Sequence, residues 1–158
     1  LRGDDFFVCR LAAQNVLGTG ADAVRAVPAL VENLRCGRPD IQCEAAAALG
    51  RIGPAAEAAV GPLLEMRQKE REDIGVSAAE ALWRIRGDRE SLERLIAALA
   101  SRNHPAQRAA AKALGGIGPA AKTALPALQD LLKHEDTFVR QAATEAVRQI
   151  NAAATKCK

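Results

Sequence analysis

One stretch that occurs twice constrains the fold more than any other feature of this chain. Residues 113–132 read ALGGIGPAAKTALPALQDLL, and residues 48–66 read ALGRIGPAAEAAVGPLLEM. In both copies a Leu-Gly pair ends an Ala-rich helix, Ile-Gly-Pro forms a corner, and a second apolar helix follows. A motif reused in this way predicts a stack of helical repeats, each burying its apolar face against its neighbours.

The repeats have a regular period. We take the last core leucine of each unit's second helix as a landmark, and the landmarks are Leu17, Leu49, Leu82, Leu114 and, in conservative form, Val147. Successive landmarks lie 32 or 33 residues apart. Relative to each landmark, apolar or small residues recur at −8, −5, −4, −1 and +3, which share one face of an α-helix. The predicted units of this single domain are a half repeat at 4–18, repeats at 21–53, 54–86, 87–118 and 119–150, and a frayed tail at 151–158.

The residues between landmarks predict the first helix of each unit, at 22–35, 55–69, 89–100 and 119–133. Capping side chains are expected before the second helices, at Asp40, Asp73, Asn103 and Asp136. Glycines suited to closing a helix are Gly18, Gly53 and Gly118. The prolines of three first helices either begin the regular helix or kink it. At the N-terminus only a second helix is expected, which suggests that the stack continues upstream.

Composition excludes several classes of function. The net charge is only +3, from 22 Lys and Arg against 19 Asp and Glu, so nucleic acid is not the expected partner. No run of about 18 apolar residues is present to span a membrane. The four cysteines have no CxxC spacing and the chain has two histidines, which predicts free thiols, a reducing cytoplasmic compartment, no metal and no cofactor. The cysteines are Cys9, Cys36, Cys43 and Cys157.

The second part of the unit matches D-x-x-V-R-x-A-A, which is carried by Asp136, Val139, Arg140, Ala142 and Ala143. Together with A-L-G-x-I-G-P-x-A, this pattern resembles HEAT repeats, in the short form found in bilin-lyase-like repeat proteins. The resemblance runs from about Asp4 to Ile150. It implies an all-α fold: a right-handed α-solenoid of antiparallel helix pairs, with about four and a half repeats. It also implies that the second helices line a concave side that binds other proteins.

Candidate binding residues follow from the repeat register. On each second helix we expect positions −7, −6, −3, −2, +1 and +2 to turn away from the core. The chain's one tryptophan, Trp83, occupies +1, where Gly50 and Gly115 stand in other units. It is either a partner-binding anchor or a filler of the space above such a glycine. The same ridge carries Arg51, Glu80, Arg84, Arg108 and Lys112. A mainly basic ridge with one aromatic suits an acidic or amphipathic peptide, although a solvated ridge without a partner has the same composition.

Enzymatic alternatives are weighed in the same register. Deoxyhypusine hydroxylases, which are HEAT-like, carry His-Glu pairs at −6 and −5, and no histidine occupies those slots here. His134-Glu135 lies in a corner, outside any inward-facing ring. Bilin lyases present aromatic and polar residues around a chromophore, whereas this chain has no Tyr. HEAT-like DNA glycosylases need a longer row of cations than the one near Glu80. The tripeptides Arg-Gly-Asp at 2–4 and 86–88 are read as coincidence.

The sequence therefore predicts a non-enzymatic scaffold that binds a protein segment along its concave surface, without catalytic residues. The alternatives are a nucleic-acid-binding module and, with less support, a bilin-lyase-type protein. Terminal repeats without a polar cap would also expose apolar faces, so end-to-end self-association is expected at uncapped ends.

Overall fold

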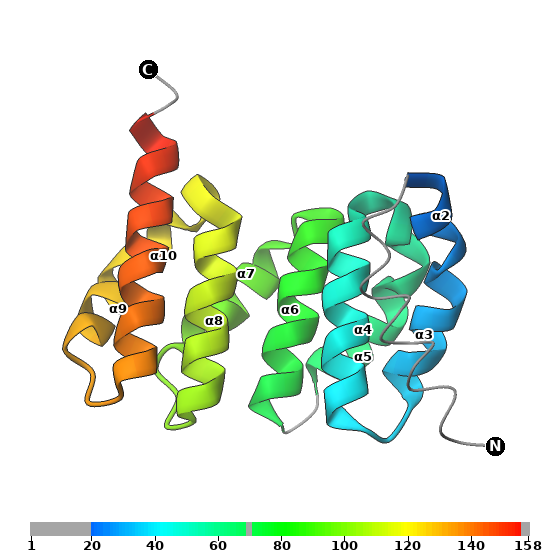
Figure 1. Cartoon of the computed structure of the whole chain (residues 1–158), viewed down its shortest axis with the longest axis horizontal. Coiled ribbons are helices and arrows are strands. Elements are labelled where there is room, and N and C mark those ends of the chain that lie inside the picture. Colours follow the sequence, from blue (N-terminus) through cyan, green and yellow to red (C-terminus); the bar gives the residue numbers. More distant parts are fainter. Residues whose placement is uncertain (1–19, 69–70, 156–158) are drawn as a thin grey trace. The chain divides into compact units, whose positions relative to one another are not determined.

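A computed structural model describes residues 20–68 and 71–155 of the chain. Every element in these ranges is an α-helix or a 3-10 helix, which confirms the predicted all-α repeat fold (Figure 1). The chain divides into two compact units, Leu1–Asp88 and Arg89–Lys158, with the boundary two residues beyond the predicted repeat boundary between 86 and 87. The half repeat at 4–18, Cys9, Cys157 and the Arg-Gly-Asp at 2–4 lie outside the described residues.

The first unit contains two helix pairs. Its elements are α2 (Gly20–Arg25), α3 (Val27–Arg35), α4 (Pro39–Ile52), the 3-10 helix η1 (Gly53–Ala59), α5 (Val60–Arg67) and α6 (Glu72–Arg86). Helix α3 packs on α4 and α5 packs on α6, while the second helices α4 and α6 lie side by side (Figure 1). Leu30, Leu49, Leu63 and Leu82 are fully buried between them. The landmark leucines are thus core residues, as the period predicted.

The second unit repeats this arrangement. Its elements are α7 (Arg89–Ala98), α8 (His104–Ile117), η2 (Gly118–Ala124), α9 (Leu125–Asp130), η3 (Leu131–Lys133) and α10 (Thr137–Thr155). Helices α8 and α10 lie side by side over a core that includes Leu95, Leu114 and Leu128. Helix α10 continues through Thr155, so the helix does not end where the repeat pattern ends, at Ile150.

Glycine corners connect the helices. Gly53, Gly87 and Gly118 have φ of 72°, 66° and 72°, the left-handed region that L side chains rarely adopt. Gly53 and Gly118 begin the 3-10 helices η1 and η2, after which a regular helix starts. The prolines therefore begin regular helices: Pro28 and Pro126 lie in the first turn of α3 and α9.

Two of the four predicted caps are confirmed. The side chain of Asn103 accepts a hydrogen bond from the N–H of Ala106 at 3.1 Å, and Asp136 accepts from the N–H groups of Phe138 and Val139. Asp40 and Asp73 were wrong as caps, because α4 and α6 begin earlier. Their carboxylates lie in the first turn instead and pair with arginines that precede the helices, Arg38 at 2.8 Å and Arg71 at 2.7 Å.

The second helices approach one another through very small side chains. A Cβ atom on Gly50 would stand 3.1 Å from the Cα of Ala81, and one on Gly115 would stand 3.0 Å from the Cα of Ala146. One turn earlier, at −3, Ala46 and Ala111 are fully buried. The expectation that −7, −3 and +1 turn away from packed surfaces is therefore wrong for α4 and α8. A second helix buries two sides, one against its own first helix and one against the next second helix.

The −7 position has a polar structural role. The Gln42 side chain donates a hydrogen bond to the carbonyl of Leu34 at 2.7 Å, and Gln107 donates to the carbonyl of Leu99 at 3.0 Å. Both glutamines are buried, and both carbonyls belong to the end of the preceding first helix. Carbonyls at a helix end lack intrahelical partners, so these glutamines satisfy groups that the fold would otherwise bury unpaired.

Replacing Gly115 by Ala tests this close approach. The new methyl group would meet backbone of α10, so we expect the free energy of unfolding to fall by about 1 to 2 kcal/mol, the usual cost of overpacking. Gly37→Ala is the matched control, because Gly37 is exposed between α3 and α4 and, apart from its chain neighbours, nothing lies within 4 Å of its added Cβ. Urea denaturation of both variants measures the difference. Equal stability of the two variants would contradict the packing described.

Candidate protein-binding surface

Positions −2 and +2 lie on the open side of the described second helices, and −6 does so in α8 and α10, whereas Val76 at −6 of α6 is buried and was wrongly expected to face outward. In the first unit these positions include Arg51, Glu80 and Arg84, and in the second unit they include Arg108 and Lys112. Arg51, Arg84, Arg108 and Lys112 are exposed and Glu80 is half-buried. Five of the six predicted binding residues thus occupy ridge positions. We call the two sets the first-unit ridge and the second-unit ridge.

On the first-unit ridge the charges are partly matched. Arg84 pairs with Glu80 at 2.9 Å, one turn apart on α6. The stem of the same arginine covers Gly50, since a Cβ there would stand 3.2 Å from the Arg84 Cδ. A half-exposed pair at this spacing contributes only about 0.3 to 0.5 kcal/mol. Its clearer effect is to hold Arg84 flat across the contact between α4 and α6.

Trp83 occupies a different kind of position from the ridge residues. The +1 residues of α4 and α8, Gly50 and Gly115, face the next second helix of their unit rather than the open surface. The atoms nearest the space above Gly50 belong to Ala81 and Arg84, and those above Gly115 belong to Gln149 and Ala146. Trp83 is thus not among the nearest neighbours of either glycine, and its role as a binding anchor or a packing residue stays a prediction. Trp83 itself is half-buried.

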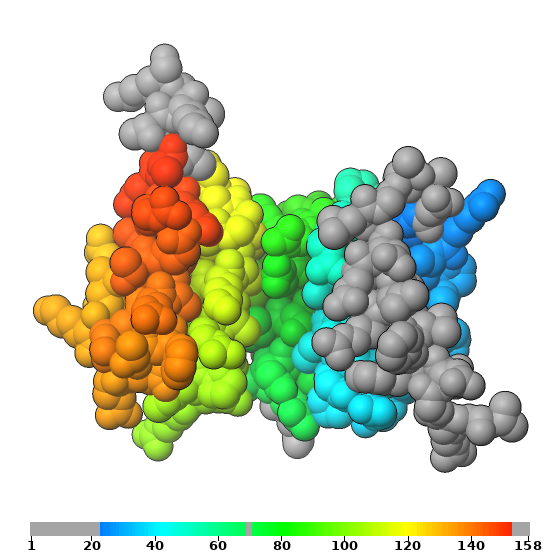
Figure 2. All heavy atoms as spheres, in the orientation of Figure 1, coloured from blue at the N-terminus to red at the C-terminus, as the bar shows by residue number. Residues whose placement is uncertain are grey.

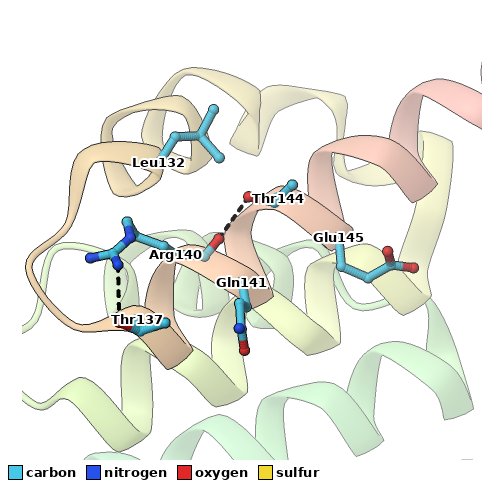
Figure 3. Close-up of a pocket in the computed structure, with 6 residues that line it drawn as sticks. All are labelled: Leu132, Thr137, Arg140, Gln141, Thr144 and Glu145. Atoms are coloured by element: carbon cyan, nitrogen blue, oxygen red, sulfur yellow. Dashed lines mark hydrogen bonds between the residues drawn. The ribbon is translucent and has the colours of Figure 1, made fainter.

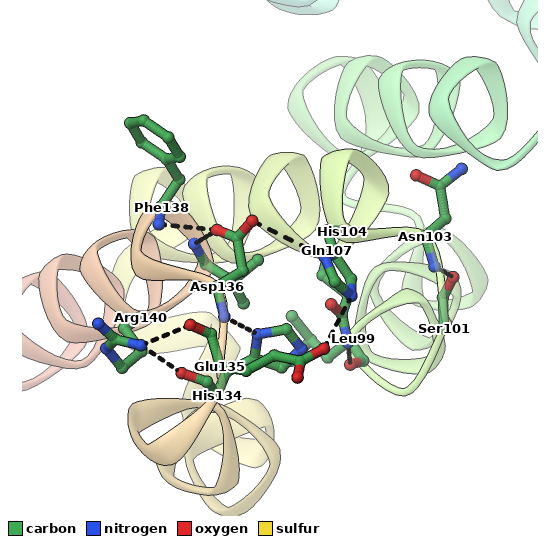
Figure 4. A network of polar contacts seen from close by, with 11 residues as sticks. Leu99, Ser101, Asn103, His104, Gln107, His134, Glu135, Asp136, Phe138 and Arg140 are labelled. Carbon is green, nitrogen blue, oxygen red and sulfur yellow. Dashed lines mark hydrogen bonds and ion pairs between the residues drawn. The ribbon is translucent and has the colours of Figure 1, made fainter.

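The corner before α10 is a polar cluster that the sequence analysis did not identify as a unit (Figure 4). The rings of His104 and His134 meet edge to face, with centroids 4.9 Å apart. His134 Nδ1 accepts a hydrogen bond from the N–H of Asp136 at 3.0 Å, and an Asp136 oxygen lies 3.7 Å from His104 Nδ1. Arg140 closes the corner by donating to the carbonyls of His134 and Glu135. These contacts join the starts of α8 and α10.

This cluster has a structural character. His134 and Glu135 lie in the corner, as the sequence predicted, and the described ranges contain no group of three ligating residues arranged to hold a metal ion. The carboxylate of Asp136 accepts hydrogen bonds from the capping N–H groups and lies 3.7 Å from His104 Nδ1. Hydrogen bonds from the N–H of Val139 and then of Phe138 hold its pKa below the ordinary value, helped by the nearby histidines.

Phe138 stands beside this cluster and was missed by the sequence analysis. Its side chain is 63% exposed and points away from the polar contacts of the corner (Figure 4). With His104, Pro105, Arg108, Asp136 and Val139 it lines a pocket of about 220 Å³. A signal was present, because the same slot in the other described units holds Asp40, Asp73 and Pro105. An aromatic residue in that slot differs from the aspartates and proline of the other units.

A second hollow, of about 370 Å³, lies over α10. Figure 3 shows its lining, which is Leu132, Thr137, Arg140, Gln141, Thr144 and Glu145. Thr144 stands at −3 and Arg148 at +1, where Ala46, Ala111, Gly50 and Gly115 are buried against a following helix. Both α10 residues are exposed and polar. Helix α10 therefore presents a polar side, and the expected apolar face for end-to-end association is absent there.

The remaining polar motifs have packing roles. Asp88 of the Arg-Gly-Asp tripeptide at 86–88 pairs with the buried Arg67 at 2.9 Å, and Gly87 closes α6, which agrees with the reading of that tripeptide as coincidence. Cys36 and Cys43 are free thiols. Burial raises the pKa of the Cys43 thiol, so it is held in its unreactive protonated form.

Comparisons with known proteins agree with this architecture. The model of the family described as HEAT repeats matches residues 61–148, and that of the Armadillo/beta-catenin-like repeat matches residues 22–52. Two crystal structures of engineered proteins are each 26% identical to this chain. Each match covers 91% of this chain. The matches cover 72% and 73% of the engineered chains, with TM-scores of 0.61 and 0.59 respectively. No protein in the curated collection matches.

A further similar structure is the complex of CpcE and CpcF of phycocyanin lyase from Nostoc sp. PCC7120. It is 26% identical, with a TM-score of 0.58 over 82% of this chain and 80% of that one. Within residues 20–68 and 71–155, no helix is long and apolar enough to cross a membrane.

The cap of α10 gives a pH-dependent prediction. Because the pKa of Asp136 is lowered on folding, its stabilising effect is complete above the ordinary value of 3.8 and is lost as pH falls through the lowered value. Asp136→Ala should lower the urea midpoint at neutral pH, whereas Asp136→Asn should keep the cap and lose less stability on acidification than the wild type. Asp130→Asn, on the exposed end of α9, is the control. An Asp136→Asn variant with the wild-type acid profile would refute this role.

Proposed function

This chain belongs to the HEAT-repeat family, and we propose that it is a non-enzymatic module that binds a segment of a partner protein along its second helices. Repeat proteins of this architecture present extended surfaces made by one helix of each pair. The similar CpcE and CpcF chains form a complex with each other, which supports an interaction role. The proposal assigns no catalytic residue and no cofactor.

The observation that supports this proposal most directly is the composition of the ridge positions. Small residues are used wherever second helices touch, at Ala46, Gly50, Ala111 and Gly115. Long charged side chains stand on the open side of each unit, at Arg51 and Arg84 in the first and at Arg108 and Lys112 in the second. Arg108 and Lys112 have no carboxylate partner among the residues that the structure describes. Exposed cations of this kind suit an acidic or amphipathic segment.

We include Arg51, Glu80, Arg84, Arg108 and Lys112 in the proposed surface, with Trp83 at its border in the first unit. Trp83 is half-buried, so part of its ring is available to a partner, and tryptophan contributes strongly where an interface covers it. The free thiols of Cys36 and Cys43 support a reducing, cytoplasmic compartment for this module.

One second candidate has a specific observation behind it. The match to phycocyanin lyase chains extends over 82% of this chain, so a role in handling a bilin chromophore is the alternative. The chain has no Tyr and one Trp, which leaves few aromatic side chains to surround a tetrapyrrole. A visible absorption spectrum after incubation with a bilin decides between the two: unchanged bands exclude chromophore binding.

Site-specific photo-cross-linking tests the interaction function. A photoreactive residue at Lys112, on the second-unit ridge, should capture a discrete protein adduct in extracts of the source organism. Arg108→Glu in the same chain should reduce that adduct by about tenfold or more, because reversing a charge introduces repulsion. The same photoreactive residue at Lys122, exposed on η2, is the matched control and should capture little.

The contrary outcomes are equally defined. Equal protein labelling from positions 112 and 122 would contradict a ridge-specific partner, and adducts that form only with nucleic acid would favour the alternative nucleic-acid role.

Trp83→Ala in the cross-linking chain should weaken capture and lower the free energy of unfolding by roughly 1 to 2 kcal/mol, as expected for a half-buried aromatic. Undiminished capture would assign Trp83 to packing alone.

A further inference from the structure

The pocket beside Phe138 combines an exposed aromatic ring with an unmatched cation. Phe138 is 63% exposed, the largest exposed fraction among the big apolar side chains that the structure describes. The guanidinium carbon of Arg108 lies 5.9 Å from the centroid of its ring, within the range of a cation–π contact. This contact brings the charge of α8 to the edge of the apolar surface of α10. The ring thus offers an apolar platform with a cation beside it.

The cations of this region are available to a ligand. Arg108 and Lys112 are one turn apart on α8 and are both exposed. Neither pairs with a carboxylate in the described part of the chain, and within that part Arg108 contacts the Phe138 ring. Arg140, by contrast, donates hydrogen bonds to the carbonyls of His134 and Glu135 and to the Thr137 hydroxyl.

Two of the nearby carboxylates have partners within the protein. Asp136 accepts the capping N–H groups of Phe138 and Val139 and approaches His104. On α10, Glu145 pairs with Arg148 at 2.6 Å and accepts a hydrogen bond from Gln149. Arg108 and Lys112 are two positive charges without a carboxylate partner among the described residues, while the exposed Glu135 lies 4.0 Å from His104 Nε2. Figure 2 shows the face that α8 and α10 form, in yellow-green and orange.

We propose that the Phe138 pocket binds an acidic segment of a partner protein, with an apolar side chain of the segment on the Phe138 ring and its carboxylates on Arg108 and Lys112. This inference rests on the proposed interaction function and names the chemistry of the partner at one site. Guanidinium groups bind carboxylates strongly because two parallel N–H groups can donate to the two oxygens. The adjacent ring supplies the apolar burial that an ion pair at a surface lacks.

The same elements, a ring and two cations, also occur where single-stranded nucleic acid binds. The charges around this pocket favour a peptide. Phosphate tracking needs a continuous row of cations along the backbone, whereas Arg108 and Lys112 are only two cations, one turn apart on α8. A peptide needs only a local match between one or two carboxylates and these cations.

Fluorescence anisotropy of the full chain with a labelled probe tests the proposal. The probe is a short peptide of glutamate and leucine, compared with the same peptide carrying lysine for glutamate and with single-stranded DNA. We expect saturable binding of the glutamate peptide that weakens as salt is raised. Phe138→Ala and Arg108→Gln should each raise its Kd by about tenfold, as for central interface residues.

Two matched variants control for general loss of apolar surface and of charge. Leu132→Ala removes another exposed apolar side chain of the second unit, outside the pocket, and Lys122→Gln removes an exposed cation on η2. Both should bind the glutamate peptide like the wild type. Thermal unfolding monitored by circular dichroism should be the same for Phe138→Ala and Leu132→Ala, since both side chains are exposed.

The failures of the two proposals are distinguishable. No binding of the glutamate peptide, equal binding of the lysine peptide, or tighter binding of DNA through Phe138 would overturn the acidic-segment assignment, whatever the cross-linking at Lys112 shows. Binding that is weakened by Arg51→Gln and Arg84→Gln but not by Phe138→Ala would keep the interaction function and refute this site.

Discussion

The close contact between successive second helices is the constraint on which the rest of the structure depends. At Gly50 and Gly115 the backbone of one helix meets an alanine of the next, Ala81 or Ala146, and there is no room for a Cβ atom without displacement. Helices that approach this closely gain dispersion energy from backbone and methyl contacts rather than from large side chains. This is why a chain with only 3% aromatic residues packs a core in each unit. It also leaves the long cationic side chains of Arg51, Arg84, Arg108 and Lys112 on the remaining open side.

Much of this architecture could be predicted from sequence, because the same pattern of residues recurs in several repeats. The corners at Gly53 and Gly118 and the caps at Asn103 and Asp136 each follow a local rule that tertiary packing did not override. Asp40 and Asp73 failed as caps because an arginine precedes each helix start and draws the carboxylate into an ion pair. The positions −7 and −3 were assigned to the open surface because a single amphipathic stripe was assumed, whereas a stacked helix buries two sides.

The candidate surface could be predicted only in part, for the same reason. Arg51, Arg84, Arg108 and Lys112 were found because charge at ridge positions is visible in the register. The place of Trp83 could not be read from its register alone, since +1 is a contact position that glycine normally fills. Phe138 was not predicted as a surface residue because it is next to the core position Val139, and an aromatic residue there has the sequence pattern of a core residue. Its exposure, and the approach of Arg108 to its ring, depend on how α8 and α10 pack.

The assignment of buried and open sides of the second helices is tested most directly by two neighbouring alanines of α4. Ala46 is fully buried at −3, while Ala47 is exposed at −2. The two methyl groups are chemically identical and one residue apart, so a soluble gadolinium chelate added to methyl-labelled protein compares them without mutation. The account predicts strong paramagnetic relaxation of the Ala47 methyl signal and little effect on Ala46. Equal relaxation of both methyl groups, or stronger relaxation of Ala46, would contradict it.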